Sequence, residues 1–282
     1  MSLYTGIRRL FIVVVFLLSA CESNLVKDAD STQANATVVT TPARVIEDRS
    51  GCVVSIVPGE FAFDSFYEKY CDADGIPIIS SRDVKDRALK QAYYLITNVL
   101  APIPKVRQEL ISHGAYLGII GVDENQTSLP EYSHLDSAFW DQRARGLGGS
   151  KHLPITSGAE ENLLCLPWDG YYGESITIHE FAHTIHLMGL GTDYAAFTSE
   201  LTGLYRSAIQ QGLWINTYAG SNVLEYWAEG VQSYFSTNLQ SDRADGVHNH
   251  VNTRDELADY DPALYDFISR FFHDFEWTPT CP

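Results

Sequence analysis

The chain has 282 residues, of which 45% are hydrophobic, and its 19 basic and 36 acidic residues give a formal net charge of −17. This length suits one large domain or two small ones and is ample for a hydrophobic core. A surface with such an acidic excess repels nucleic acid and anionic lipid headgroups, so we expect no nucleic-acid partner.

The first residues are typical of an export signal. Arg8 and Arg9 precede an apolar run over 10–18, which is too short to span a membrane and is followed by Ser-Ala-Cys. This ending resembles the bacterial lipobox, which implies cleavage before Cys21 and its acylation; an ordinary signal with an incidental cysteine is the alternative. We therefore expect a lipoprotein signal peptide over 1–20 and a lipid-anchored protein of the bacterial cell envelope, facing the periplasm or the exterior.

Composition changes after the signal. Residues 21–45 are rich in Ser, Thr, Asn, Asp and Ala, which indicates a flexible tether, and we expect one folded domain over 46–282. Hydrophobic patterns in its first part predict four elements. These are a strand over 52–57, a helix over 82–100, a second helix carrying Val106, Leu110 and Ile111, and a buried strand over 115–121.

Four cysteines follow Cys21, and an even number in an exported chain favours disulfides. No two of them form a CxxC motif, so a cysteine zinc site is not expected. Four cysteines allow three disulfide connectivities, and all three are open. We favour Cys52–Cys71 together with Cys165–Cys281, which would join the C-terminal end to the segment before residue 175.

The stretch 122–172 has the Gly- and Pro-rich composition of a long loop, and a loop of this length usually carries function. Its aromatic residues indicate that it packs. Several of its polar residues are candidates for lining a substrate groove, with local ion pairs and turn caps as the alternative: Arg143, Arg145, Glu160, Glu161 and Asn162.

The sequence His-Glu-Phe-Ala-His over 179–183 is an HExxH motif inside an apolar, helix-like run. Residues four apart share one helix face, so His179 and His183 can bind one zinc ion (Zn²⁺), with Glu180 directed at its water. Buried histidines need partners, which favours a metal over a structural pair. His186 is expected to support the ligands or line the cleft. Because residues 186 and 189 are His and Gly, the long metzincin pattern is excluded.

A catalytic zinc also needs a third protein ligand and an open position for water. Two glutamates are candidates, Glu200 and Glu225. Glu225 lies in an apolar helical stretch and shares one face with Glu229. Two unpaired carboxylates would be costly there, whereas a metal and a histidine Nδ1–H would account for both. We therefore favour Glu225; a capping role beside Asn222, or an exposed side chain, is the alternative.

The C-terminal part carries signals of stability more than of chemistry. Thr253 and Glu256 form a capping box that begins a helix, and Asp261-Pro262 begins the last one. His248 and His250 lie in a polar loop and are expected to be solvated.

Taken together, these residues resemble the gluzincin metallopeptidases related to anthrax lethal factor, which include Pro-Pro endopeptidases. The resemblance covers about 175–236 and rests on the HExxH and on the Glu-Tyr-Trp-Ala-Glu of 225–229, with Tyr218 in a Gly- and Asn-rich loop before it. It implies that His179, His183 and Glu225 bind zinc, that Glu180 is the general base, and that Tyr218 stabilises the oxyanion. It also implies that Glu229 lies outside the ligands and supports them.

We therefore expect an α+β, zincin-like metallopeptidase domain, with a small sheet packed on the HExxH helix and a mainly helical C-terminal half. The predicted function is a monomeric zinc hydrolase, a peptidase acting on peptides or proteins and attached to the membrane by its lipid. Two alternatives remain open: a surface lipoprotein that binds a partner and carries a structural or inert zinc, and an amidase acting on cell-wall peptides.

Overall fold

The structure, a computed structural model, describes residues 45 and 47–281. The predicted signal peptide, the acylation site at Cys21 and the tether up to residue 44 lie outside the described residues. Within the described part of the chain, no helix is long and apolar enough to cross a membrane.

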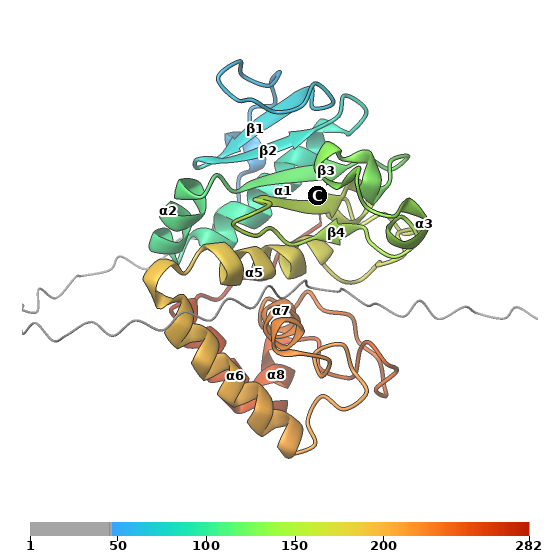
Figure 1. Cartoon of the computed structure of the whole chain (residues 1–282). Coiled ribbons are helices and arrows are strands. Elements are labelled where there is room, and N and C mark those ends of the chain that lie inside the picture. The colour runs from blue at the N-terminus through green and yellow to red at the C-terminus, as the bar shows by residue number, and fades with distance from the viewer. Residues whose placement is uncertain (1–44, 46, 282) are drawn as a thin grey trace, which may run out of the picture.

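The upper half of the molecule in Figure 1 contains a mixed five-stranded sheet. Its strands lie in the order β1 (Lys69–Ala73), β2 (Ile76–Ser80), β3 (Tyr116–Ile120), β5 (Ile155–Ala159) and β4 (Gly146–Leu147). The central pairs β2–β3 and β3–β5 are parallel, and the outer pairs β1–β2 and β5–β4 are antiparallel. Every residue of β2 and β5 is buried, as expected for strands covered on both faces.

The hairpin between β1 and β2 depends on a two-residue turn. Asp74 and Gly75 form the turn and both have positive φ angles, 53° and 94°. This is the conformation that lets a tight turn follow the twist of the strands, and Asp-Gly is among the sequences best suited to it. The hairpin was not predicted, although the sequence contains this signal.

Helices cover the sheet and continue below it. The helices α1 (Asp86–Leu100), α2 (Pro104–Ser112) and α5 (Ile176–Met188) belong to the upper half, with α5 along its lower border. The long connection between β3 and α5 contains two short helices, α3 (Ser137–Trp140) and α4 (Glu160–Leu163), besides β4 and β5. The loop predicted over 122–172 therefore includes one fully buried central strand.

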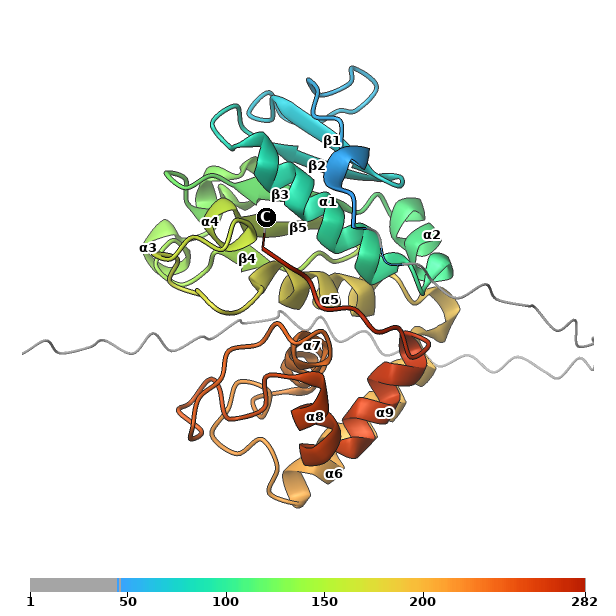
Figure 2. The same ribbon diagram turned by 180° about the vertical axis from the view of Figure 1, so that it is seen from behind.

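Four helices make up the lower half of Figure 1 and Figure 2: α6 (Tyr194–Gln210), α7 (Val223–Tyr234), α8 (Arg254–Tyr260) and α9 (Pro262–Phe271). The predicted capping box is confirmed, with reciprocal hydrogen bonds between Thr253 and Glu256, and the Asp261 side chain caps α9 at Leu264 N. The molecule is thus α+β, with a small mixed sheet and a helical C-terminal half.

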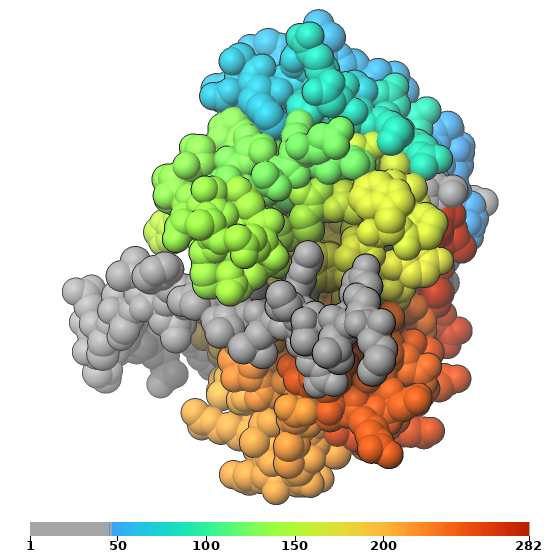
Figure 3. Space-filling model, turned by 90° about the vertical axis from the view of Figure 1, so that its right-hand side faces the viewer, coloured from blue at the N-terminus to red at the C-terminus, as the bar shows by residue number. Residues whose placement is uncertain are grey.

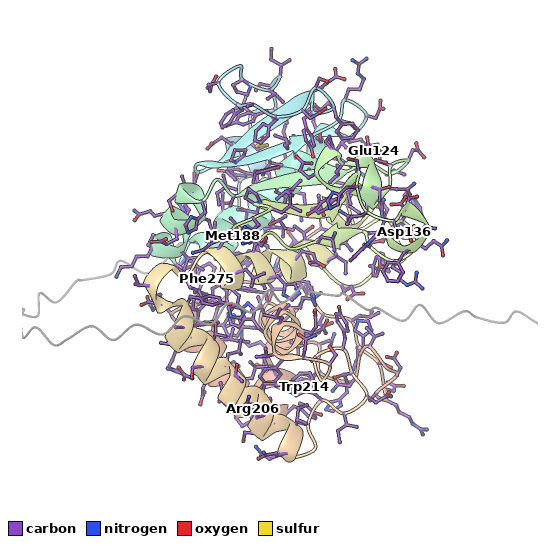
Figure 4. The ribbon with its side chains drawn as sticks, viewed as in Figure 1. Glu124, Asp136, Met188, Arg206, Trp214 and Phe275 are labelled. Atoms are coloured by element: carbon purple, nitrogen blue, oxygen red, sulfur yellow. A yellow bond between two sulfur atoms is a disulfide. The ribbon has the colours of Figure 1, made fainter. Side chains whose placement is uncertain are left out.

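One hydrophobic core joins the two halves. It contains Leu89 of α1, Phe181 of α5, Trp227 of α7 and Phe272 just after α9. In Figure 4, Met188 and Phe275 lie near α5 at the junction of the halves, while Trp214 and Arg206 lie in the lower one.

Both predicted disulfides are confirmed. Cys52 is bonded to Cys71, and Cys165 to Cys281. Figure 2 shows the C-terminal segment, in red, running from α9 past α5 to the upper half, where the second disulfide holds it. The strand predicted over 52–57 is wrong in extent, because only a single bridge, from Ser55 to Tyr70, forms there.

Candidate metal centre

The HExxH sequence lies on α5, a helix between the sheet and α7 that is buried at all but one of its residues. Its first turn is capped twice. The Ser175 side chain accepts from Ile178 N, and Asn162 Oδ1 accepts from Ile176 N at 2.9 Å. These caps satisfy backbone donors that a buried helix start would otherwise leave unpaired.

Helix α7 brings the third candidate ligand to α5. Its N-cap is Asn222, whose side chain accepts from the backbone N–H groups of Leu224 and Glu225. Asn222 therefore caps the helix, and the Glu225 carboxylate turns toward α5 instead. Glu225 is fully buried.

Three side-chain atoms converge between α5 and α7. The Nε2 atoms of His179 and His183 lie 3.1 Å apart, and Glu225 Oε2 lies 3.1 Å and 3.2 Å from them. Within the described chain, this is the one group of His, Cys, Asp or Glu side chains arranged so that it could hold a metal ion.

The chemistry of this group fits a divalent cation. Tetrahedral ligands about 2.0–2.1 Å from zinc lie about 3.3 Å from one another, which is close to the separations found here. The other Glu225 oxygen, Oε1, is buried and has no hydrogen-bond partner among the described residues, which is costly for a carboxylate. Two imidazoles and one carboxylate are the donor set of catalytic zinc sites of the His₂Glu kind.

The far nitrogen of His179 is held by α7. Gln232 Oε1 lies 2.8 Å from His179 Nδ1, and Glu229 Oε1 lies 3.4 Å from it. Gln232 also donates from Nε2 to the carbonyl of Ser175, the cap of α5. The predicted support from Glu229 is therefore present, and Gln232 is a closer partner that sequence reasoning missed. Its spacing, seven residues after Glu225 on the same helix face, was the available signal.

Charges in the group are strongly coupled. Burial favours neutral forms, but hydrogen bonds to Glu225 and Glu229 raise the pKa of His179 well above its ordinary value. Burial alone would raise the pKa of Glu225. The attraction of His183 and His179 outweighs it and keeps this pKa below the ordinary value. Positive charge beside Glu225 thus stabilises its buried carboxylate, and a bound metal ion would supply such charge.

Glu180 lies beside the ligands on α5 and is also buried. Burial raises the pKa of its carboxyl group, against the attraction of His179 and His183 and a hydrogen bond from the Gly148 backbone. A carboxylate with raised pKa, next to the candidate metal and not among its ligands, is suited to accept a proton.

The edge strand β4 and the residues after it pass very close to α5. A methyl group on Gly148 would lie 2.6 Å from His183 Cβ, and one on Gly146 would lie 3.0 Å from Glu180 Cγ. Glycine at these positions lets the backbone of this edge reach the HExxH face of α5.

A cavity opens next to the candidate ligands. His179, Glu180, Tyr218 and Glu229 line it together with residues of the 139–146 segment. The Tyr218 ring stacks on His179, with ring centroids 6.0 Å apart and an angle of 21° between the planes. The backbone N–H of Tyr218 donates to the carbonyl of Val247. Figure 3 shows one face of the molecule, with the green and yellow segments of the upper half above the orange C-terminal half.

Two predicted site residues lie elsewhere. His186 hydrogen-bonds Thr198 of α6 at 2.9 Å and packs against Tyr194 and Phe197, so its partners are on α6 and are not the candidate metal ligands. Burial lowers its pKa to about 4. Glu200, the alternative third ligand, lies in a surface ion pair with Arg270 at 2.6 Å.

The polar residues of the long loop divide into two groups. Arg143 and Arg145 line the cavity. Glu160, Glu161 and Asn162 form ion pairs and caps, such as Glu161 with Arg145 and Glu160 with Lys85. The alternative of local ion pairs and caps therefore holds for Glu161 and Asn162, whereas Glu160 pairs with Lys85, 75 residues earlier in the chain.

His248 is a cavity residue that the sequence analysis expected to be solvated. Its side chain is nearly buried, and Nε2 lies 3.2 Å from the Glu174 carboxylate. His250, two residues on, is exposed as expected. Loop composition could not separate the two, because Glu174 is 74 residues earlier in the chain.

In comparisons with known proteins, no family description and no curated protein sequence matches this chain.

Proposed function

We propose that this protein is a zinc-dependent peptidase of the zincin-like, gluzincin type. The observation that carries the proposal is the convergence of His179 Nε2, His183 Nε2 and Glu225 Oε2 within 3.2 Å of one another. The second Glu225 oxygen is buried and has no hydrogen-bond partner in the described part of the chain. The position of Glu180 beside this group and on the cavity supports hydrolysis rather than a purely structural metal.

In this proposal His179, His183 and Glu225 hold the metal. A zinc ion held there would supply Lewis acidity, the chemistry that makes water a nucleophile near neutral pH. Glu180 accepts a proton from the attacking water and returns it to the leaving amine. The Tyr218 hydroxyl donates a hydrogen bond to the oxyanion, while Gln232 and Glu229 fix the orientation of His179.

We also propose that the protein is exported and anchored at the cell envelope through Cys21. Two disulfides in the described chain fit an oxidising compartment. A Cys21→Ser variant expressed in a bacterial host should move from the membrane fraction to the soluble fraction, and retention in the membrane would refute the anchor.

The central test combines metal analysis with cleavage profiling. Glu180→Gln should retain zinc and lose activity by roughly 10²–10⁴-fold, because only the proton acceptor is removed. Glu225→Ala should lose zinc. Glu200→Ala is the matched control, a surface glutamate whose removal should change neither zinc content nor cleavage.

Three outcomes would overturn the proposal. Loss of zinc from Glu200→Ala, with zinc retained in Glu225→Ala, would show that the ligand set is wrong. One bound zinc with no cleavage in a broad peptide library would indicate the alternative, a binding protein with a structural or inert zinc; cleavage confined to cell-wall peptides would indicate an amidase.

A further inference from the structure

The cavity beside the candidate metal contains two arginines that differ in their pairing. Arg145 is fully engaged: Nε and Nη2 donate to the two Glu161 oxygens at 2.6 Å and 2.8 Å, and Nη1 donates to Glu124 O at 2.5 Å. Its charge is compensated, and its donors hold the loop together. Arg145 is thus a structural residue.

Arg143 is held differently. Nη1 donates to the carbonyl of Phe139 at 3.2 Å, and the guanidinium lies over the Phe139 ring, 4.3 Å from its centroid. Its own carbonyl accepts from the Tyr171 hydroxyl at 2.7 Å, which fixes the backbone. Among the described residues, no carboxylate forms an ion pair with Arg143.

The other charged groups of the cavity do not compensate Arg143. Glu174 pairs with His248, and Glu229 accepts from Asn238 at 2.9 Å and lies near His179. Glu180 lies beside the ligand histidines and accepts from the Gly148 backbone. Arg143 is therefore the cation of this cavity whose charge the described residues leave unmatched.

An unmatched arginine is unexpected in a chain with 36 acidic and 19 basic residues. The guanidinium is always charged, and its planar fork of donors matches a carboxylate in a bidentate geometry. Stacking on Phe139 restricts the orientation of the Arg143 guanidinium before a ligand binds, so less side-chain entropy is lost on binding. These properties are those of a recognition residue.

We propose that Arg143 determines specificity by binding a carboxylate of the substrate, next to the aromatic side chains of Phe139, Trp140 and Tyr171. The inference rests on the proposed peptidase function and gives it a substrate class. The carboxylate belongs either to an acidic side chain or to the free C-terminus of a peptide, and the two sources differ in the experiment below.

The test uses peptide pairs that differ only in charge. In one set, Asp is exchanged for Asn, or Glu for Gln, at one position at a time; in the other, a free C-terminus is exchanged for the amide. Wild-type protein loaded with zinc should favour the carboxylate member of one set by about 10- to 100-fold in kcat/KM. A preference for the carboxylate member in the first set shows that Arg143 binds an acidic side chain. A preference found only in the second set shows that it binds the free C-terminus.

Variants of Arg143 connect the ratio to this residue. Arg143→Gln should bring the ratio close to one while cleavage of the neutral member changes little, and Arg143→Glu should favour lysine-containing peptides. Arg206→Gln is the matched control, because Arg206 is exposed on α6 in the lower half (Figure 4), and it should keep the wild-type ratio. A wild-type ratio near one, or a ratio that persists in Arg143→Gln, would overturn the inference.

A binding measurement separates this inference from the proposed function. Dissociation constants of the same pairs are measured by calorimetry on Glu180→Gln, alone and combined with Arg143→Gln. An Arg143-dependent ratio without any hydrolysis by wild type would refute the peptidase and leave the carboxylate site standing. Hydrolysis without an Arg143-dependent ratio would refute only the carboxylate site. If neither peptide of any pair is bound or cleaved, both the peptidase function and the carboxylate site are refuted.

Discussion

Glu225 and Glu229 lie one turn apart on α7, and their different surroundings give them different tasks. Glu225 reaches the Nε2 atoms of both histidines and is fully buried. Glu229 accepts from Asn238 and faces only the far nitrogen of His179, at 3.4 Å. The position along the helix thus decides which carboxylate is available to a metal and which one lies beside the far nitrogen of a candidate ligand.

A first prediction concerns Gln232. Replacement by Met removes the acceptor 2.8 Å from His179 Nδ1, so the ring loses the partner that fixes its tautomer and orientation. Zinc affinity should fall by about 10- to 100-fold, measured by competition with a chromophoric chelator. Gln210→Met, at an exposed position in α6, is the control and should leave affinity unchanged. Equal affinities of Gln232→Met and wild type would mean that Glu229 alone orients His179.

A second prediction concerns pH and His248. Burial favours the neutral ring, but the hydrogen bond to Glu174 and the charges of Glu174, Glu229 and Asp245 raise the pKa of His248 above its ordinary 6.5. Its pKa is higher in the folded than in the unfolded chain, so the charged ring contributes stability below about pH 6.5, which is lost as pH rises through the folded-state pKa.

The measurement is urea unfolding of wild type and His248→Gln over a pH series. The difference in free energy of unfolding between them should be largest in mildly acidic solution and shrink as pH rises. His250→Gln, which changes an exposed histidine two residues away, should show no such trend. A difference that grows with pH would contradict the assigned sign.

At the scale of elements, the candidate centre depends on the contact between the β4 edge and α5. Gly148 is the tightest point, because an added methyl group would lie 2.6 Å from His183 Cβ and 3.0 Å from the Glu180 carbonyl oxygen. Neither neighbour is the far end of a flexible side chain. The helix or the strand must therefore move to admit a larger residue.

A third prediction follows from this contact. Gly148→Ala should lower the free energy of unfolding by about 1–3 kcal/mol through overpacking and should weaken zinc binding by displacing His183. Gly203→Ala is the matched control: Gly203 lies in α6 with open space around it, and this change should stabilise the protein by roughly 0.5–1 kcal/mol. Denaturant unfolding and zinc titration measure both effects, and a neutral Gly148→Ala would show that the two elements are not closely coupled.

For the whole molecule, the disulfides close loops of very different length. Cys52–Cys71 spans 19 residues, whereas Cys165–Cys281 spans 116 and joins the C-terminal segment to the upper half. The entropy of loop closure in the unfolded chain gives about 3 kcal/mol for the first and about 5 kcal/mol for the second. The longer loop should therefore contribute more to stability.

A fourth prediction compares the two bonds. The double variant Cys165→Ser/Cys281→Ser should lose more stability than Cys52→Ser/Cys71→Ser, measured by urea unfolding without reductant. The second pair is the control for the loss of a disulfide as such. A larger loss for the short loop would show that local packing around Cys52 and Cys71, rather than loop closure, dominates.

Sequence patterns alone predicted the elements that carry strong local signals. The apolar run of α5 with Ser175 before it, the Thr253–Glu256 capping box and the Asp261-Pro262 start of α9 all depend on residues within one helical turn. The turn between β1 and β2 depends on an equally local signal, the Asp-Gly pair at 74 and 75. Strand β5 was not predictable in this way, because its Ile-Thr-Ser-Gly-Ala sequence is buried only by the strands and the helix around it.

The sequence by itself determined the candidate histidines and the preference for Glu225, because residues four apart on a helix must share a face whatever surrounds them. It determined Glu180 through the HExxH motif. The tertiary structure decided which of the remaining polar residues join them. It places Gln232 beside His179, Glu174 beside His248, and Arg143 in the cavity without an ion-pair partner among the described residues. It also places His186 against α6 and Glu200 beside Arg270. Most of these partners are dozens of residues apart in the chain, so only the packing of distant elements against one another fixes their pairing.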